Sequence, residues 1–288
     1  MNSSSSSQID QAFDPLIPLS LTARKNPPLL CIPGAGASIS SLVALATTVE
    51  EGYSIYGLEP RGIDSTYPPH ESVQAAAHCN LRAIANHGIT GPIHLLGHSH
   101  GGSVAFEMAC LMQAQGMTVA SLALVDSEPP QTAPEIILNL TDRELFDEFA
   151  GAIRLTFEQE LMLDEDVLRN GNTNLFLEHL HGVMSKSGIL PRRSSPDMLH
   201  GPFTTFSAAR RAGYCSTSRY NGVVYLVQVS DPVLNPDADI QQRAEYAAGW
   251  RKCASELVIW TGPGHHFSIL RQPHVKLLAQ WWNNVVKK

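Results

Sequence analysis

The sequence has no apolar run that approaches the length of a membrane span, and it has no excess of positive charge. Charged residues make up 16% of its 288 residues and the formal net charge is −7, which argues against a general affinity for nucleic acids or anionic membranes. Residues 1–7 are polar and rich in serine, so they lack the hydrophobic region of a secretory signal. We therefore expect a cytoplasmic protein that has neither a membrane nor a nucleic acid as its partner.

Cysteine is rare, and its pattern predicts neither disulfides nor a metal site. The cysteines number five and form no C-x-x-C pair, which favours buried, reduced thiols. The glycine-rich segment 33–36 lacks the further glycine and the later acidic residue of a dinucleotide site, and it has no Walker lysine. We expect no metal and no bound cofactor. The cysteines are Cys31, Cys79, Cys110, Cys215 and Cys253.

What the chain does have is a high content of apolar residues, arranged in a regular pattern. Hydrophobic residues make up 43% of it, enough to bury a full parallel sheet. From residue 28 onward, short apolar runs alternate with helical stretches, which is the pattern of β-α-β units. We therefore predict an α/β fold with a mostly parallel sheet flanked by helices. The predicted strands are 29–32, 54–58, 93–96, 121–125, 223–229 and 257–260, and the predicted flanking helices are 41–49, 72–86, 101–115 and 273–286.

The regular pattern changes between residues 134 and 219, where we find helical patterns and no convincing strand. Thr141 and Glu144 form a capping box, which predicts the start of an amphipathic helix. An insertion between sheet strands would lie over their carboxyl ends, where ligands bind in open α/β sheets, and we interpret it as a lid. Further helices are predicted at 174–184 and 203–214. The predicted division is a disordered tail at 1–12, a core in two parts at 13–133 and 220–288, and the helical lid insertion at 134–219.

The segment Gly97-His98-Ser99-His100-Gly101 matches the G-x-S-x-G pattern of a nucleophile elbow. It follows a predicted strand and precedes a predicted helix, which is the context that this pattern requires. The flanking positions of so tight a turn must be glycine, and the N-terminus of the helix favours a developing oxyanion. We therefore predict that Ser99 is a catalytic nucleophile.

A serine hydroxyl needs a base, and the residues offer two histidines and two acids for the remaining roles. In this kind of site the order along the chain is serine, acid, histidine. His265 and His266 follow the last predicted strand, and either fits on chemistry alone. Asp126 ends the strand 121–125, whereas Asp231 follows the strand 223–229, which is the usual place for the acid. The spacing does not decide between the members of either pair.

Two backbone N–H groups are expected to form the oxyanion hole. One belongs to the residue after the nucleophile, His100, and the other to the loop after the first core strand. That loop is the segment 33–36, in which Ala35 is the candidate.

Five segments of the core carry a family resemblance: 28–34 (PLLCIPG), 56–62 (YGLEPRG), 91–102 (GPIHLLGHSHGG), 124–127 (LVDS) and 263–270 (PGHHFSIL). Together they resemble the thioesterase domains of non-ribosomal peptide and polyketide synthetases, which belong to the α/β-hydrolase superfamily. The resemblance covers nearly the whole core and is weakest in the insertion. It implies an α/β-hydrolase fold.

The resemblance also implies site residues and a reaction. That family places its acid at the end of the strand after the nucleophile's helix, here Asp126, and its histidine directly before the phenylalanine of the late motif, here His266. Its members take an acyl or peptidyl chain from the phosphopantetheine arm of a carrier protein through an acyl-serine. The acyl or peptidyl chain is then released either by hydrolysis with water or by macrocyclisation through an internal nucleophile. Both reactions belong to the biosynthesis of natural products, antibiotics included. The carrier protein is then the expected partner.

Other functions stay open at this stage. An acyltransferase that shuttles acyl groups between carrier proteins and a free-standing editing thioesterase would use the same triad. The opening segment 13–19 resembles the start of a synthetase's terminal thioesterase, which favours product release. The synthetase-like segments argue against a lipase or esterase of free esters, and the complete triad argues against a scaffold that only binds.

The chain departs from the family pattern at two positions. His100 stands where an apolar residue is expected, and His265 stands where an acidic residue is common. We expect the His100 ring to pack or to meet solvent, as most lone histidines do; if it pointed into the pocket, it would alter how the leaving group or the nucleophile is handled. Four arginines are candidates for the phosphate of the carrier arm, although solvated surface charge is the simpler interpretation. They are Arg192, Arg193, Arg210 and Arg211.

Overall fold

The computed structural model describes residues 12–21, 26–131, 140–170, 172–216, 218–231 and 233–287. Apart from residue 12, the tail predicted at 1–12 lies outside the described residues. Within them, strands form one sheet in the order β1-β3-β2-β4-β5-β6-β7. All neighbouring pairs are parallel except β1 with β3. The strands are β1 (Leu16–Ser20), β2 (Leu29–Ile32), β3 (Ile55–Leu58), β4 (Ile93–His98), β5 (Val119–Val125), β6 (Tyr220–Ser230) and β7 (Ala254–His265).

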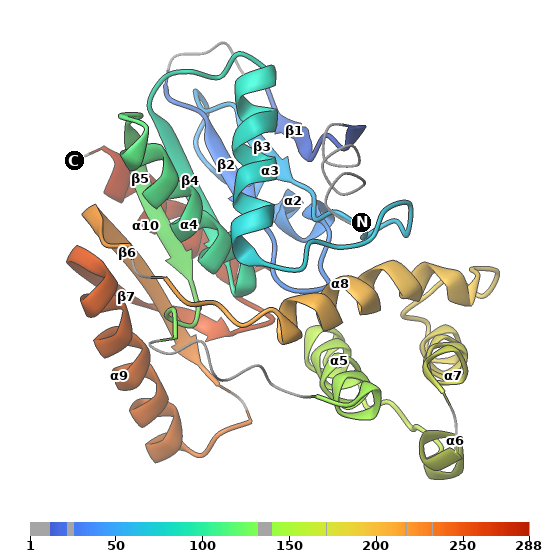
Figure 1. Cartoon of the computed structure of the whole chain (residues 1–288). Helices are drawn as coiled ribbons and strands as arrows, with labels where there is room; N and C mark the ends of the chain where they lie inside the picture. Colours follow the sequence, from blue (N-terminus) through green and yellow to red (C-terminus); the bar gives the residue numbers. More distant parts are fainter. Residues whose placement is uncertain are drawn as a thin grey trace.

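Helices cover both faces of this sheet, so the predicted architecture is confirmed (Figure 1). One buried cluster joins α3, α4 and α9 to one face of the sheet, and a second joins α2 and α10 to the other face. Successive side chains of a strand point to opposite faces, so Leu30 enters the first cluster whereas Leu29 and Cys31 enter the second. The flanking helices are η1 (Ile39–Leu42), α2 (Val43–Ala46), α3 (Val73–Asn86), α4 (His100–Ala114), α9 (Pro236–Cys253) and α10 (His274–Val286).

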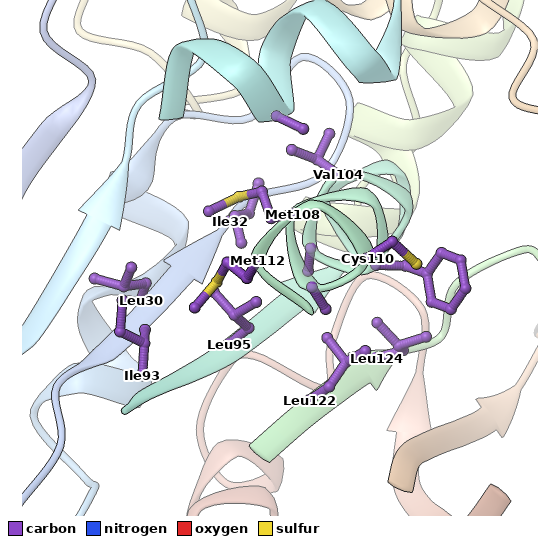
Figure 2. Packing of buried hydrophobic residues seen from close by; sticks show 14 of the residues in the cluster. Leu30, Ile32, Ile93, Leu95, Val104, Met108, Cys110, Met112, Leu122 and Leu124 are labelled. Atoms are coloured by element: carbon purple, nitrogen blue, oxygen red, sulfur yellow. The ribbon is translucent and has the colours of Figure 1, made fainter. Parts of the chain in front are cut away.

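The central helix α4 is buried on nearly all sides. Met108 and Met112 pack over Leu30 and Leu95 of the neighbouring strands β2 and β4, and Figure 2 shows these side chains together between the helix and the sheet. A helix that is apolar all round belongs in the interior of a protein, and close packing there resists displacement. The first residue of α4 is therefore held firmly at the carboxyl edge of the sheet.

Between β5 and β6 the described chain is helical, and these helices have an apolar core of their own. Phe146, Phe176 and Phe203 lie at its centre. Thr141 and Glu144 make both hydrogen bonds of the predicted capping box. The helices are α5 (Asp142–Phe157), α6 (Glu165–Asn170), α7 (Thr173–Lys186), η2 (Pro196–Leu199) and α8 (His200–Arg211). They lie together beside the sheet in Figure 1. That they act as a lid stays a prediction, as do the domain boundaries.

The helix α8 connects this insertion to the sheet. It packs so closely on the loop after β2 that a Cβ at Gly36 would lie 2.8 Å from the Cβ of Phe206. Ala35 of the same loop packs against the apolar core of the insertion. The insertion thus lies at the carboxyl end of β2.

Two elements, β1 and α9, were not expected from the sequence. The strand β1 is a five-residue edge strand that contains Pro18, and proline is tolerated at an edge because it has no N–H to donate. The helix α9 buries only Asp239, Ala247 and Trp250, so it carries almost no apolar periodicity. The helix expected at 41–49 is shorter, because η1 and α2 occupy residues 39–46.

The remaining expectations from composition concern thiols, metals and membranes. All five cysteines are free, and burial raises the pKa of Cys31 and of Cys110 to about 12. Among the described residues, no group of His, Cys, Asp or Glu side chains is arranged to hold a metal, and no helix is both long and apolar enough to span a bilayer. The cytoplasmic location stays a prediction.

A buried histidine on β4 makes the stability of this core depend on pH. His94 meets Ser121 Oγ at 2.8 Å through its Nδ1 atom, and its ring lies edge-on to Tyr53 and Trp282. Burial lowers the pKa of His94 to about 4. In the unfolded chain the pKa of a histidine is about 6.5. Between these values the unfolded chain binds more protons than the folded one.

We therefore expect the free energy of unfolding to fall as the pH decreases from about 6.5 to about 4, by up to about 1.4 kcal/mol per pH unit for this histidine. The variant His94→Phe should take up about one proton fewer on unfolding near pH 5.5. Urea unfolding across a pH series measures this uptake as the slope of the free energy against pH. His78→Phe, at an exposed position of α3, is the matched control and should leave the slope unchanged. An equal slope in the His94 variant and the parent would contradict the assignment.

Candidate active site

Ser99 occupies the sharp turn between β4 and α4, as predicted. Its backbone has φ 54° and ψ −126°, a conformation that is costly for a residue with a side chain and is typical of functional sites. The N–H group of Ser99 donates to Val125 O at 2.8 Å, and Ser99 O accepts from the N–H of Gly102 at 2.9 Å. These bonds tie the strained residue to the end of β5 and to the first turn of α4.

Glycines make this turn sterically possible. A Cβ at Gly97 would collide with the carbonyl group of Gly101, and a Cβ at Gly101 would collide with the carbonyl oxygens of Ile32 and Pro33. The helix therefore begins in direct contact with the loop after β2. This close approach brings that loop to the side of Ser99.

Asp126 and His266 meet at the same edge of the sheet. Asp126 follows β5, and its Oδ2 atom lies 2.6 Å from Nδ1 of His266, which follows β7. The Asp126 backbone is also left-handed, with φ 48°, and its N–H group donates to Val227 O at 2.8 Å. The two side chains are 18% and 27% exposed, respectively. They are thus shielded enough for a strong charge-assisted hydrogen bond, yet a reactant can reach the imidazole.

A second histidine holds the loop that carries His266. The His98 Nε2 atom lies 3.0 Å from the carbonyl oxygen of His266, and the two rings are 4.8 Å apart. Because a carbonyl oxygen only accepts, Nε2 of His98 carries the proton. Burial, followed by the neighbouring His266 imidazole, lowers the pKa of His98 to about 3. His98 is therefore neutral, and it does not oppose a positive charge on His266 with one of its own.

The two residues that competed for these roles point elsewhere. The Oδ1 atom of Asp231 accepts from the N–H group of Val233 at 2.8 Å, as in a turn, and no hydrogen bond within the described residues joins Asp231 to His266. The His265 Nδ1 atom accepts from the N–H group of Phe267 at 3.3 Å. Geometry thus brings Asp126, and not Asp231, against His266.

Ser99 and His266 belong to neighbouring loops at this edge, although no hydrogen bond joins them in the part of the chain that the structure describes. Hydrogen bonds of catalytic groups are often long before a substrate binds and tighten in the complex. The backbone N–H groups of Ala35 and His100 likewise have no backbone partner among the described residues. They are free to bind an oxyanion, so the predicted roles of all five residues are proposals compatible with this geometry.

His100 is one of the residues that line a cavity beside this site, and it is partly exposed, so the expectation that its ring packs or meets solvent stays a prediction. The cavity lies between the loop after β2, α3, α4 and α8. Burial, followed by the positive charge of Arg210, lowers the pKa of His100 to about 4. The ring is therefore neutral near pH 7.

Two of the four arginines proposed for a phosphate group are engaged by carboxylates. Arg210 meets Glu148 through Nε at 2.7 Å and Nη2 at 3.3 Å, and Arg211 meets Asp142 at 2.7 Å. Both pairs join α8 to α5 within the insertion, so these arginines are structural. Residues 192 and 193 are exposed.

Sequence reasoning missed the role of His98 and one support of Asp126. The residue after Asp126, Ser127, accepts a hydrogen bond through its backbone oxygen from Trp250 Nε1 at 2.9 Å, and Trp250 lies on the helix that was not expected. A signal for His98 existed, because a polar ring at the end of an otherwise buried strand requires a hydrogen-bond partner. Its partner, a backbone carbonyl 168 residues away, has no sequence signature.

Comparison with known proteins places the chain among enzymes of one type. A family model described as "Thioesterase domain" matches residues 27–280. The atromentin synthetase of Suillus grevillei is 33% identical over 119 residues, which are 41% of this chain and 12% of that protein. A dimodular nonribosomal peptide synthase of Bacillus subtilis is 36% identical over 123 residues, 43% of this chain and 5% of that protein. The chain thus spans only a small part of these relatives.

Solved structures share the fold along nearly the whole chain. A four-domain nonribosomal peptide synthetase, AB3403, superposes with a TM-score of 0.79 at 19% identity, covering 97% of this chain and 21% of that one. The Vlm2 thioesterase domain gives a TM-score of 0.66 at 20% identity, with 93% and 96% covered. The type II thioesterase BorB gives a TM-score of 0.65 at 18% identity, and the superposition covers 94% of this chain and 97% of that one. These likenesses show the α/β-hydrolase fold.

The hydrogen bond from His98 leads to a prediction that separates positioning from mere stability. His98→Leu removes the donor to His266 O, so the imidazole should lose its fixed orientation toward Ser99. We expect the rate constant for labelling of Ser99 by a fluorophosphonate to fall by about tenfold to a hundredfold, the usual cost of a misplaced catalytic group. His98→Gln keeps an N–H donor and should retain most of the rate. Equal losses in both variants, with both folded by circular dichroism, would contradict the positioning role.

Proposed function

The chain belongs to the thioesterase domain family, and on this premise we propose that it releases an acyl or peptidyl chain from the phosphopantetheine thioester of a carrier protein, through an acyl intermediate on Ser99. The observation that carries this proposal is the 2.6 Å contact between Asp126 and His266 beside the strained turn of Ser99. Natural-product assembly is the proposed context, because the matched relatives include a nonribosomal peptide synthase and the solved likenesses include synthetase domains.

Acylation begins with the transfer of one proton. In the proposed mechanism Nε2 of His266 takes the proton of the Ser99 hydroxyl as its oxygen attacks the thioester carbonyl. Asp126 accepts from the Nδ1–H group, which fixes the tautomer and stabilises the imidazolium. The neutral His98, 4.8 Å from the His266 ring, adds no opposing charge.

The tetrahedral intermediate carries its negative charge toward the loop after β2. The N–H groups of Ala35 and His100 are the proposed donors, and the first turn of α4 adds the favourable end of the helix dipole. When the intermediate collapses, the carbon–sulfur bond breaks and the imidazolium of His266 protonates the departing thiolate of the carrier arm to a thiol.

Release of the acyl-serine completes the cycle. His266 then takes a proton from water, which gives a free acid, or from a hydroxyl or amine of the chain itself, which gives a ring. The deprotonated oxygen or nitrogen bonds to the acyl carbon, the bond from that carbon to Ser99 Oγ breaks, and the imidazolium returns the proton to Ser99. Both outcomes belong to the proposal. The carrier protein supplies the phosphopantetheine as part of the substrate, so no bound cofactor of this chain enters a step.

Removal of one oxygen atom tests the nucleophile. Ser99→Ala should abolish the acyl adduct that intact-protein mass spectrometry detects after mixing with an acyl-pantetheine thioester, and thioester cleavage should fall by at least about a thousandfold. Ser103→Ala, one helical turn further along α4, is the matched control and should keep both. An adduct of the same mass on the Ser99 variant would sink the assignment.

The fate of the acyl group distinguishes release from transfer. A carrier protein loaded with an acyl chain is mixed with the protein and with an unloaded second carrier, and the products are resolved by mass spectrometry. We expect free acid or ring. Movement of the acyl group to the thiol of the second carrier would instead establish an acyltransferase.

A further inference from the structure

A small cavity lies directly behind the proposed oxyanion hole. Its volume is about 60 Å³, and Ala35 and His100 form part of its wall. On the opposite side the cavity is closed by Thr205, Ala209 and Ala212, which belong to α8 and the turn after it. The cavity therefore lies where the sheet, α3, α4 and the helical insertion meet, and it adjoins the atoms that would hold the thioester carbonyl.

The ring of His100 offers hydrogen bonds that no protein atom takes up in the part of the chain that the structure describes. Among the described residues, no hydrogen bond engages either ring nitrogen, whereas burial keeps the ring neutral, with its pKa lowered to about 4. A neutral imidazole has one N–H donor and one acceptor. The residue is partly exposed, so this donor and this acceptor are accessible to a small molecule that enters the cavity.

Other polar side chains of the wall already have partners in the protein. The Nδ2 atom of Asn80 donates to Met108 Sδ at 3.6 Å. Thr205 Oγ1 donates to Gly201 O at 2.5 Å. Glu59 Oε2 accepts from the N–H group of Ile39 at 2.7 Å. His100 differs from them, because its ring is available to a molecule in the cavity.

Size and charge limit what this molecule can be. A cavity of 60 Å³ is larger than the roughly 15 Å³ that one water requires, yet smaller than the roughly 150 Å³ that accommodates benzene. Only a group of a few non-hydrogen atoms fits. Glu59 and Arg61 line the same space with opposite charges, and Arg61 already donates to Pro68 O and Pro69 O. The wall therefore has no net charge that would attract an ionic group.

We propose that the cavity binds a short, uncharged substituent of the acyl group close to the thioester carbonyl, and that His100 selects a substituent that carries a hydroxyl. This inference rests on the proposed function, and it names the substrate class: short hydroxyacyl groups, or chains that end in one, are preferred to plain alkanoyl and to aryl-substituted groups. His100 is then a specificity residue through its side chain, in addition to the proposed role of its backbone N–H group.

The test compares substrates that differ by one oxygen atom. The probes are the pantetheine thioesters of butyric, 2-hydroxybutyric and 3-hydroxybutyric acids, and the measured quantity is kcat/KM for each. We expect the protein to prefer at least one hydroxylated probe to butyryl by about tenfold or more, because a site built to bind a hydroxyl discriminates strongly against its absence. The 3-phenylpropionyl thioester should be a poor substrate, since its ring exceeds the cavity.

Substitution of His100 should remove the discrimination. In His100→Leu the ratio of hydroxylated to plain substrate should fall to about one, whereas His100→Asn keeps a donor and an acceptor and should keep part of the preference. Because each variant is compared with itself on two substrates, a general loss of activity cancels. His78→Leu, an exposed histidine on α3, is the matched control and should keep the full ratio.

A variant on the far wall of the cavity keeps the test decisive if His100→Leu fails to fold. Ala209→Leu fills the space from α8, so kcat/KM for all three four-carbon probes should fall about tenfold relative to acetyl-pantetheine. The inference would be overturned if His100→Leu kept the parent's ratio of hydroxylated to plain substrate. Where the His100 variant does not fold, it would be overturned if Ala209→Leu kept the parent's ratio of four-carbon probes to acetyl-pantetheine. Either result would leave the proposed function intact. Absence of any thioester cleavage and of any acyl-Ser99 would instead overturn the proposed function.

Discussion

The strained turn at Ser99 is the constraint on which the rest of the site depends. A positive φ at a residue with a side chain persists only where its surroundings over-determine it. Here β4 enters the turn from the centre of the sheet, and the fully packed α4 leaves it. The absence of a Cβ at Gly101 lets the helix start against the loop after β2. The same packing thus presents the hydroxyl and positions the proposed oxyanion donors.

The sequence predicted this part of the molecule well for a physical reason. Buried parallel strands must be short and apolar, and a turn this tight must have glycine beside it, so both leave local signals. The sequence did not reveal α9, because a helix that buries three residues of eighteen has almost no apolar period. Nor did the spacing of residues separate Asp126 from Asp231. That choice depends on which loop end faces His266, and only the resemblance to a family or the coordinates supply it.

Three imidazoles near Ser99 show how surroundings divide roles among identical side chains. His98 faces a carbonyl oxygen and acts as a neutral donor. His266 faces the carboxylate of Asp126, which lies 2.6 Å from its Nδ1 atom. His100 faces a cavity and has no protein partner among the described residues. The ring beside the carboxylate is the proposed base, whereas burial keeps the other two neutral.

The insertion contributes to this site through the same loop that would hold the oxyanion. Because α8 packs on Gly36 and Ala35 and also closes the cavity beside His100, a shift of α8 would change the shape of the cavity and the position of the Ala35 N–H group together. The salt bridges of Arg210 and Arg211 fix α8 to α5, so these helices would move as a unit. The proposed recognition of the acyl substituent and the proposed stabilisation of the oxyanion would therefore be coupled mechanically, since one helix forms the boundary of both.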